Sequence, residues 1–247
     1  MTDSYRDVSF WFDTLPEAIR PRAPLDGDLE LDVAIVGAGF SGLWTAYYLA
    51  RLRSELRIGI VEAEVAGFGA SGRNGGWCIG LLAGIEGLLQ REERRAAGIA
   101  LQREAFAAVD EVGRVAAAER IDCHYRKGGS VRVARTPAHL HALRERTEAL
   151  ASLFGREDFR WLGPDECAAH VRLPGALGGF YTPHCAALHP ARLARGLADC
   201  VERLGVRVFE RSRVERLAPG CARTARGVIR AALIVRATEA YTAELPG

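Results

Sequence analysis

The sequence has 247 residues, enough for one large or two modest domains with a sizeable hydrophobic core. Hydrophobic residues make up 49% and charged residues 26%, which is typical of an ordinary soluble globular protein. The net charge of +2 gives no electrostatic reason to expect a nucleic-acid or membrane partner. The sequence has neither a signal-peptide pattern at its start nor an apolar run of about 18 residues, so a cytoplasmic protein is expected.

Six cysteines are spread along the chain without a CxxC pair or the spacing of metal ligands. This pattern predicts free thiols in a reducing compartment and no metal site. The six residues are Cys78, Cys123, Cys167, Cys185, Cys200 and Cys221.

Residues 1–31 form a polar arm in which Pro16, Pro21 and Pro24 prevent a long helix or strand. Its one strongly apolar patch is Ser9-Phe10-Trp11-Phe12. We interpret this patch as an anchor that packs the arm onto the body of the protein.

A dinucleotide-binding fingerprint follows the arm. Residues 33–36 read as a buried parallel strand and lead directly into Gly-x-Gly-x-x-Gly, formed by Gly37, Gly39 and Gly42. Residues 43–52 read as a helix, and a second strand over 57–61 ends at Glu62. The whole pattern predicts an α/β fold with a Rossmann-like βαβ unit and a parallel sheet.

Each residue of the fingerprint has a physical reason. Gly37 permits a tight turn, Gly39 lets backbone approach a pyrophosphate, and Gly42 lets the helix pack closely. The amino end of the helix attracts the phosphates. Glu62 can accept hydrogen bonds from a ribose diol and would repel a 2′-phosphate. The alternative is a glycine-rich turn that binds no ligand.

A second glycine-rich segment, residues 67–76, comes directly after the acidic residue. Such a segment exposes many N–H groups and lets backbone lie against a flat ligand. It favours a bound flavin over the rival reading, a nicotinamide-dependent dehydrogenase. Residues 32–43 and Gly69-Ala70-Ser71-Gly72-Arg73-Asn74-Gly75-Gly76 resemble the D-amino-acid oxidase-like flavoproteins, and in particular their γ-glutamylputrescine oxidase-like branch.

The resemblance implies FAD as cofactor and a small-molecule amine or amino acid as substrate, with the oligomeric state left open. It implies hydride transfer to the flavin, with dioxygen as the acceptor that yields hydrogen peroxide. It places Arg73 and Asn74 nearest the isoalloxazine, the backbone of Val214 against the adenine, and the strand ending Ala237-Thr238 against the diphosphate. Ala240 stands where the family has glycine. The implied cofactor-binding residues are Gly37, Gly39, Phe40, Ser41, Gly42, Glu62, Ala63, Gly69, Ala70, Ser71, Arg73, Asn74, Gly75, Gly76, Val214, Ala237 and Thr238.

The remaining elements suggest a domain inserted into the nucleotide fold. The pattern predicts a helix over 85–120, a hairpin over 123–134, a helix over 137–153, a helix start at 163–166 and a strand over 178–181. It then predicts a helix over 191–204 closed by Gly205, strands over 206–209 and 213–217, and two short strands within 227–237. On the helix over 85–120, the expected core stripe is Leu101, Ala105, Ala108, Val109 and Val112.

The predicted domains are therefore an FAD-binding domain of residues 32–84 and 185–247, and a partial α+β substrate domain of residues 85–184. Relatives in the family continue well beyond residue 247, so a C-terminally truncated fold is expected. A truncated, non-catalytic FAD-binding fragment is the alternative function.

Several other side chains are candidates for a chemical role. His189 before Pro190 is expected to start a helix rather than to act in catalysis. His124 and Tyr125 could face a substrate, and Cys78 could approach the flavin, although a small buried thiol is the usual case. The sequence shows no nucleophile–base arrangement, because in this family the cofactor carries the hard chemistry.

Overall fold

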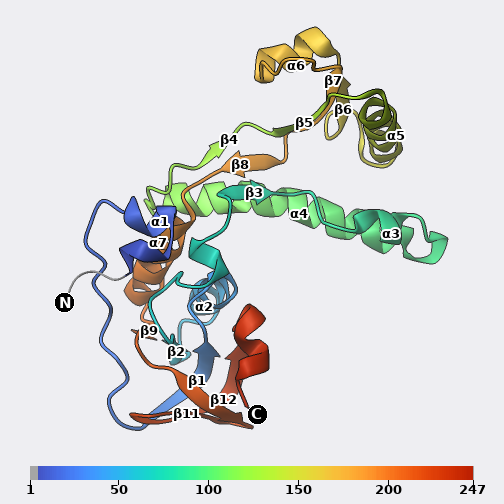
Figure 1. Cartoon of the computed structure of the whole chain (residues 1–247). Helices are drawn as coiled ribbons and strands as arrows, with labels where there is room; N and C mark the ends of the chain where they lie inside the picture. Colours follow the sequence, from blue (N-terminus) through green and yellow to red (C-terminus); the bar gives the residue numbers. More distant parts are fainter. Residues whose placement is uncertain (1–4, 247) are drawn as a thin grey trace. The chain divides into compact units, whose positions relative to one another are not determined.

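The computed structural model describes residues 5–246, so the first four residues of the predicted arm and Gly247 lie outside the described residues. The chain divides into two compact units (Figure 1). The first contains residues 5–75, 118–123 and 189–246, and the second contains residues 76–117 and 124–188. Within 5–246, no helix combines the length and the hydrophobicity that a membrane crossing requires.

A six-stranded sheet in the order β10-β11-β12-β1-β2-β9 forms the first unit (Figure 1). The pairs β12–β1, β1–β2 and β2–β9 are parallel, whereas β10, β11 and β12 pair as an antiparallel meander. Helix α2 connects β1 to β2, which confirms the predicted βαβ unit with its parallel sheet. The strands are β1 (Leu29–Val36), β2 (Ile58–Val61), β9 (Arg207–Phe209), β10 (Val214–Ala218), β11 (Cys221–Thr224) and β12 (Gly227–Arg236).

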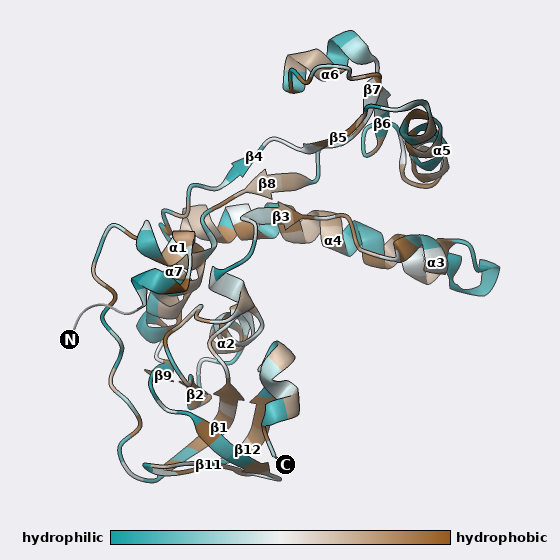
Figure 2. Ribbon diagram, in the orientation of Figure 1, coloured by the Kyte–Doolittle hydropathy of each residue, from teal (hydrophilic) through white to brown (hydrophobic). Residues whose placement is uncertain are grey.

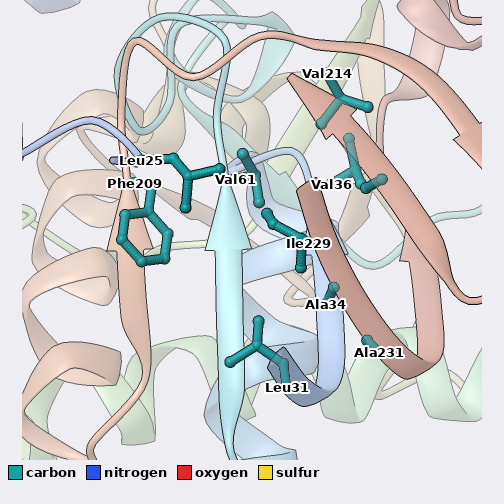
Figure 3. Packing of buried hydrophobic residues seen from close by; sticks show 10 residues of the cluster. Leu25, Leu31, Ala34, Val36, Val61, Phe209, Val214, Ile229 and Ala231 are labelled. Carbon is teal, nitrogen blue, oxygen red and sulfur yellow. The ribbon is translucent and has the colours of Figure 1, made fainter. Parts of the chain in front are cut away.

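The hydrophobic core of this unit lies on the sheet (Figure 3). Val36 and Val61, at the ends of the neighbouring parallel strands β1 and β2, pack with Val214 of β10 and Ile229 of β12. Leu25 of the arm joins the same cluster and is almost completely buried. Residues 33–36 of β1 are apolar in a continuous run because this half of the strand is buried among its neighbours, as a central parallel strand must be.

Helices α2 (Phe40–Leu52) and α7 (Pro190–Arg203) belong to the first unit, with the short 3₁₀ helices η2 (Ala70–Gly72) and η3 (Glu239–Glu244). His189 starts α7, as predicted: its Nδ1 accepts a hydrogen bond from the Arg192 N–H at 3.2 Å. Its Nε2 lies 3.2 Å from Thr14 Oγ1, and its ring packs against Trp11. Gly205, with φ +90°, follows the helix as its expected terminator.

In the described part of the arm, residues 5–28 contain two short helical turns, η1 (Arg6–Val8) and α1 (Phe10–Asp13). Phe12 is fully buried in a cluster with Ile19, Val65 and Ala191, which confirms the predicted anchor, although Phe10 of the same patch is 69% exposed. Strand β1 begins at Leu29, inside the range predicted as arm.

The second unit contains two three-stranded sheets, β3-β8-β4 and β5-β7-β6. The predicted hairpin over 123–134 is wrong: β4 pairs with β8 and β5 pairs with β7, so the two strands belong to different sheets. The strands are β3 (Trp77–Ile79), β4 (Arg126–Lys127), β5 (Ser130–Ala134), β6 (Arg160–Leu162), β7 (Gly178–Thr182) and β8 (Cys185–Ala187). The other helices are α3 (Ile85–Leu89), α4 (Glu92–Ala118), α5 (Pro137–Phe154) and α6 (Pro164–His170).

The helix predicted over 85–120 is two helices, α3 and α4, and its core stripe is partly wrong. Val109 is buried, but Leu101 is 51% exposed and Ala108 is also exposed. The buried side of α4 carries Gln102 and Phe106 instead. Figure 2 shows hydrophilic and hydrophobic residues alternating along α4, as in a helix with one packed face.

The strands after residue 213 also differ from the prediction. Residues 227–236 form one ten-residue strand, β12, rather than two short ones. It runs parallel to β1 from Leu29↔Ile229 to Val36↔Arg236, and this long partner keeps it continuous. Strand β11 had no sequence prediction.

Candidate cofactor site

A pocket of about 470 Å³ lies in the first unit, where the carboxyl ends of three strands meet. Val36 ends β1, Val61 ends β2, and Ala237 directly follows β12. Ligands of open α/β sheets bind at this edge. The pocket-lining residues that the sequence predicted are Gly37, Gly39, Phe40, Ser41, Glu62, Ala63, Gly69, Ala70, Ser71, Val214, Ala237 and Thr238.

The turn after β1 is held between two neighbouring strands. Gly37 has φ +107°, which confirms that this turn needs glycine. Its N–H donates to Val61 O at 2.8 Å, while the Ala237 N–H donates to Val36 O at 2.9 Å. A Cβ at Gly37 would lie only 2.4 Å from Ala237 O. Backbone hydrogen bonds therefore hold in place the turn that lines the pocket.

Helix α2 begins directly over this turn. A Cβ on Gly42 would come within 2.0 Å of Gly37 O, which explains the third glycine of the fingerprint. The amides of the first helical turn have no acceptor within the helix. The Phe40 N–H is satisfied by Ser71 Oγ at 2.8 Å, and a Cβ on Gly39 would lie 3.0 Å from the same oxygen. The two glycine-rich segments thus meet at the amino end of α2.

The half-buried carboxylate of Glu62 is bound at both oxygens. Oε2 accepts the Ala38 N–H at 2.7 Å, and Oε1 accepts the Glu64 N–H at 3.0 Å. Burial raises the pKa of Glu62 above its usual range, although the two N–H groups favour the ionised form. Each carboxylate oxygen has a second lone pair, so Glu62 can still accept from a ligand hydroxyl.

Arg73 and Asn74 do not line the pocket, but they contact residues that do. The Arg73 guanidinium lies over the Phe68 ring at 4.9 Å and donates to Tyr241 Oη at 2.9 Å. Asn74 Nδ2 donates to Ser71 O at 2.9 Å. Phe68 and Tyr241 both line the pocket, and sequence reasoning missed both. The aromatic ring inside each glycine-rich or turn segment was the signal that could have identified them.

The predictions for Val214, at the start of β10, and for the turn after β12 have different outcomes. Val214 and Thr238 line the pocket, as does Glu239, which has φ +46°. In this turn Ala240 stands where the family has glycine, which put a close backbone approach there in question. The left-handed conformation lies one residue earlier, and the Ala240 N–H donates to Glu239 Oε2 at 2.5 Å.

The pocket is also lined by acidic side chains that the sequence analysis did not single out. They are Glu64, Glu215, Glu239 and Glu244. Arg213 balances part of this charge, with Nη2 at 3.4 Å from Glu64 Oε1. An anionic diphosphate bound here would therefore depend on backbone N–H groups and on the arginines near the pocket, because the carboxylates would repel it.

The other predicted residues lie elsewhere. Gly42 and Gly75 are in the first unit but outside the lining, within the part of the chain described. Gly76, Cys78 and Tyr125 belong to the second unit, where the Tyr125 hydroxyl donates to Val109 O at 2.6 Å. All six cysteines, each within residues 5–246, carry free thiols as predicted.

Two histidines of the second unit carried no sequence signal. His184 Nε2 lies 2.6 Å from Asp158 Oδ1, and its ring stacks on Phe106 at 3.7 Å. His170 packs beside Tyr181. His124 adopts a left-handed conformation with φ +54°.

The pocket fits a dinucleotide. It has a glycine turn that side chains would fill, a helix amino end with first-turn amides, and a carboxylate at the end of the second strand. Its volume and its lining also suit a ligand with an apolar ring system.

Comparisons with known proteins agree with this geometry. A family model described as DAO, FAD dependent oxidoreductase, matches residues 32–247. The chain is 31% identical over 236 residues to gamma-glutamylputrescine oxidoreductase of Escherichia coli, covering 93% of this chain and 51% of the relative. It is 28% identical over 243 residues to the probable oxidoreductase OrdL of Haemophilus influenzae, covering 96% and 55%. The chain thus spans about half the length of these relatives.

Solved structures share the fold. Glycine oxidase from Geobacillus kaustophilus aligns with a TM-score of 0.70 at 23% identity, over 87% of this chain and 57% of that one. L-Amino acid deaminase from Proteus myxofaciens, in complex with anthranilate, aligns with a TM-score of 0.72 at 17% identity, over 91% and 48%. Since the family model covers most of the sequence and the pocket has the geometry of a dinucleotide site, this chain belongs to the DAO family of FAD dependent oxidoreductases, whose cofactor is FAD.

Proposed function

We propose that the chain is the FAD-binding part of an oxidoreductase that oxidises the C–N bond of an amine or amino acid. The observation that carries this proposal is the pocket at the ends of β1, β2 and β12, with Glu62 bound to the turn below it. Glycine, an L-amino acid and gamma-glutamylputrescine, the compounds in the names of three similar proteins, all contain an amino group.

In this proposal the residues of the pocket bind and orient the cofactor. Glu62 accepts from the ribose hydroxyls, the amino end of α2 and the Gly37–Gly39 turn bind the diphosphate, and the backbone of Val214 contacts the adenine. Residues 237–238 lie against the diphosphate. Residues 85–184 contribute part of a substrate domain.

Bound FAD supplies an acceptor for a hydride from the substrate α-carbon, and dioxygen then takes both electrons to give hydrogen peroxide. The oxidised amine is an imine, which water hydrolyses. Arg73 places a positive charge beside the cofactor loop, where a cation would stabilise negative charge on a bound reduced flavin.

The testing experiment is a visible absorption spectrum of the purified chain, before and after acid release of the chromophore. Oxidised-flavin bands in the released fraction are expected for non-covalent FAD, and a screen of amines and amino acids for peroxide follows. Protein that stays colourless with added FAD refutes the proposal. Protein that binds FAD but yields no peroxide from any amine supports the alternative, a non-catalytic FAD-binding chain.

A further inference from the structure

The glycine-rich cofactor loop, residues 67–76, is held by the N-terminal arm at several points. Ser9 Oγ donates to Gly72 O at 3.1 Å, and Trp11 Nε1 donates to Asn74 O at 2.6 Å. Tyr5 Oη donates to Glu64 Oε2 at 3.1 Å, just before the loop. Two side chains of the arm therefore bind carbonyl groups of the very segment that walls the pocket.

Packing joins the same two segments. The Tyr5 ring meets the Phe68 ring edge-on, with 6.1 Å between their centroids, and Phe68 lines the pocket. The fully buried Phe12 lies so close to Gly72 that a Cβ there would be 2.6 Å from Phe12 Cε2. Gly72 has no side chain where it faces the arm, and Phe12 fills the space beside it.

The arm is itself fixed by a buried charge network at the end of β9. Glu210 is fully buried, and its Oε1 accepts from Arg22 Nη1 at 3.1 Å and from the Ala66 N–H at 2.8 Å. The Arg22 N–H donates to Glu210 Oε2 at 2.7 Å. Burial acts to lower the pKa of Arg22, but hydrogen bonding to Glu202 and the nearby carboxylates raise it overall. One carboxylate thus ties the arm to the backbone just before the cofactor loop.

We propose that residues 5–13 of the arm are a positioning element, which holds residues 67–76 in the shape that binds FAD. A free glycine-rich segment samples many conformations, and ordering it on binding weakens affinity. The arm orders it beforehand, so the ligand meets a preformed wall. This inference rests on the proposed function for its ligand, but the ordering of the loop can be measured without FAD.

Ser9 allows a sharp test because its hydroxyl has two separable roles. It accepts from the Phe12 N–H at 3.3 Å as the N-cap of α1, and it donates to Gly72 O. Ser9→Asp keeps an N-cap acceptor but has no proton to donate. Ser9→Thr keeps both, and the extended backbone at residue 9 (φ −165°) suits a β-branched side chain. Trp11→Phe keeps an aromatic ring, though a smaller one, and removes the donor to Asn74, while Asp13→Asn changes an exposed position on the same helix.

The experiment is hydrogen–deuterium exchange of the full chain without FAD, followed by FAD titration of the same proteins. In Ser9→Asp and Trp11→Phe, exchange within residues 67–76 should be about five-fold faster and the FAD dissociation constant about five-fold higher, the effect of one lost hydrogen bond. Ser9→Thr and Asp13→Asn should match the wild type in both. Exchange in β1 and β2 should be unchanged in all four.

Unchanged exchange in residues 67–76 of Ser9→Asp and Trp11→Phe would overturn the inference, whatever FAD does. Faster exchange with unchanged FAD affinity would overturn it as well, because the arm would then be a structural anchor only. If the wild type binds no FAD, the proposed function fails, and the exchange data still decide whether the arm orders the loop.

Discussion

Glu62 holds the turn of the fingerprint, and we propose that it also binds the cofactor ribose. Its two oxygens accept the backbone N–H groups of Ala38 and Glu64, and the residue lines the pocket. The Glu62→Ala variant is expected to weaken FAD binding by about 1–3 kcal/mol, since a charged acceptor is lost. Isothermal titration calorimetry with FAD measures this. Glu62→Gln, which keeps one acceptor oxygen, should lose less, and an unaltered affinity in Glu62→Ala would remove Glu62 from the ribose.

Gly39 lies where a side chain meets the second glycine-rich segment. A Cβ would be 3.0 Å from Ser71 Oγ, and valine adds two further methyl groups at a residue that lines the pocket. We expect Gly39→Val to abolish FAD binding. Gly75→Val adds the same side chain in open space and should still bind. Recovery of Gly39→Val with one flavin per chain would refute the fingerprint assignment.

Asp32 lies in β1 at the start of the βαβ unit, and its low pKa makes the stability of the protein depend on pH. The side chain and the backbone N–H of Arg57 lower the pKa of Asp32 to about 2. A carboxylate whose folded pKa is depressed stabilises the protein above its unfolded pKa of about 4, and this stabilisation is lost as the pH falls toward about 2. The difference in unfolding free energy between wild type and Asp32→Asn should therefore be constant above about pH 5 and shrink below it.

An NMR titration provides the direct check on Asp32. The carboxyl resonance should titrate near pH 2 in the wild type. In Arg57→Gln the midpoint should move up toward about 4, the ordinary value. A wild-type midpoint near 4 would show that the Arg57 contacts do not persist in solution.

At the scale of an element, α4 shows why a hydropathy stripe can mislead. Gln102 is fully buried, with Nε2 donating to Gly80 O at 2.5 Å and Oε1 accepting the Leu82 N–H at 3.3 Å. Its neighbour Leu101 is 51% exposed. Hydropathy assigns glutamine to the surface. The backbone groups that satisfy Gln102 come from a segment about 20 residues away along the chain, so no local pattern shows them.

The two adjacent positions on α4 give opposite expectations. Gln102→Ala leaves a buried carbonyl and a buried N–H without their partner and should lower the unfolding free energy by about 2 kcal/mol. Leu101→Ala should change it by less than about 0.5 kcal/mol, as for a surface substitution. Urea denaturation of the two variants tests this, and a larger loss in Leu101→Ala would restore the sequence-based stripe.

The strands of the second unit likewise show that local sequence does not determine tertiary contacts. The alternation over residues 123–134 predicted a hairpin because a Gly128-Gly129 turn joins two short polar–apolar runs. In the structure β8 and β7 supply better partners from residues 178–187, so the two runs join different sheets. Strand pairing depends on which distant segment is available, and local sequence does not encode that.

For the molecule as a whole, a ligand that binds only the folded chain must raise its stability. At an FAD concentration 100 times the dissociation constant, the gain is about 2.7 kcal/mol. NADP at the same concentration should give no gain, because its 2′-phosphate would face Glu62. Thermal unfolding with each ligand measures both effects. Equal stabilisation by NADP would contradict the assigned role of Glu62.

The sequence by itself determined the βαβ unit, the glycine fingerprint, the acidic residue that ends the second strand and the second glycine-rich segment. These are local signals: a strand, a turn and a helix follow one another within about 30 residues, and the glycines answer steric demands of their own turn. The resemblance to a flavoprotein family came from the same short stretch.

Tertiary structure alone decided what lies beside that stretch. It brought Tyr241 against Arg73, Phe12 against Gly72, and the buried Glu210 against both Arg22 and Ala66. It also made β12 a single long strand beside β1 and turned Gln102 inward. Each of these contacts joins residues far apart along the chain, and their energy depends on packing and on the satisfaction of buried polar groups, which no local pattern records.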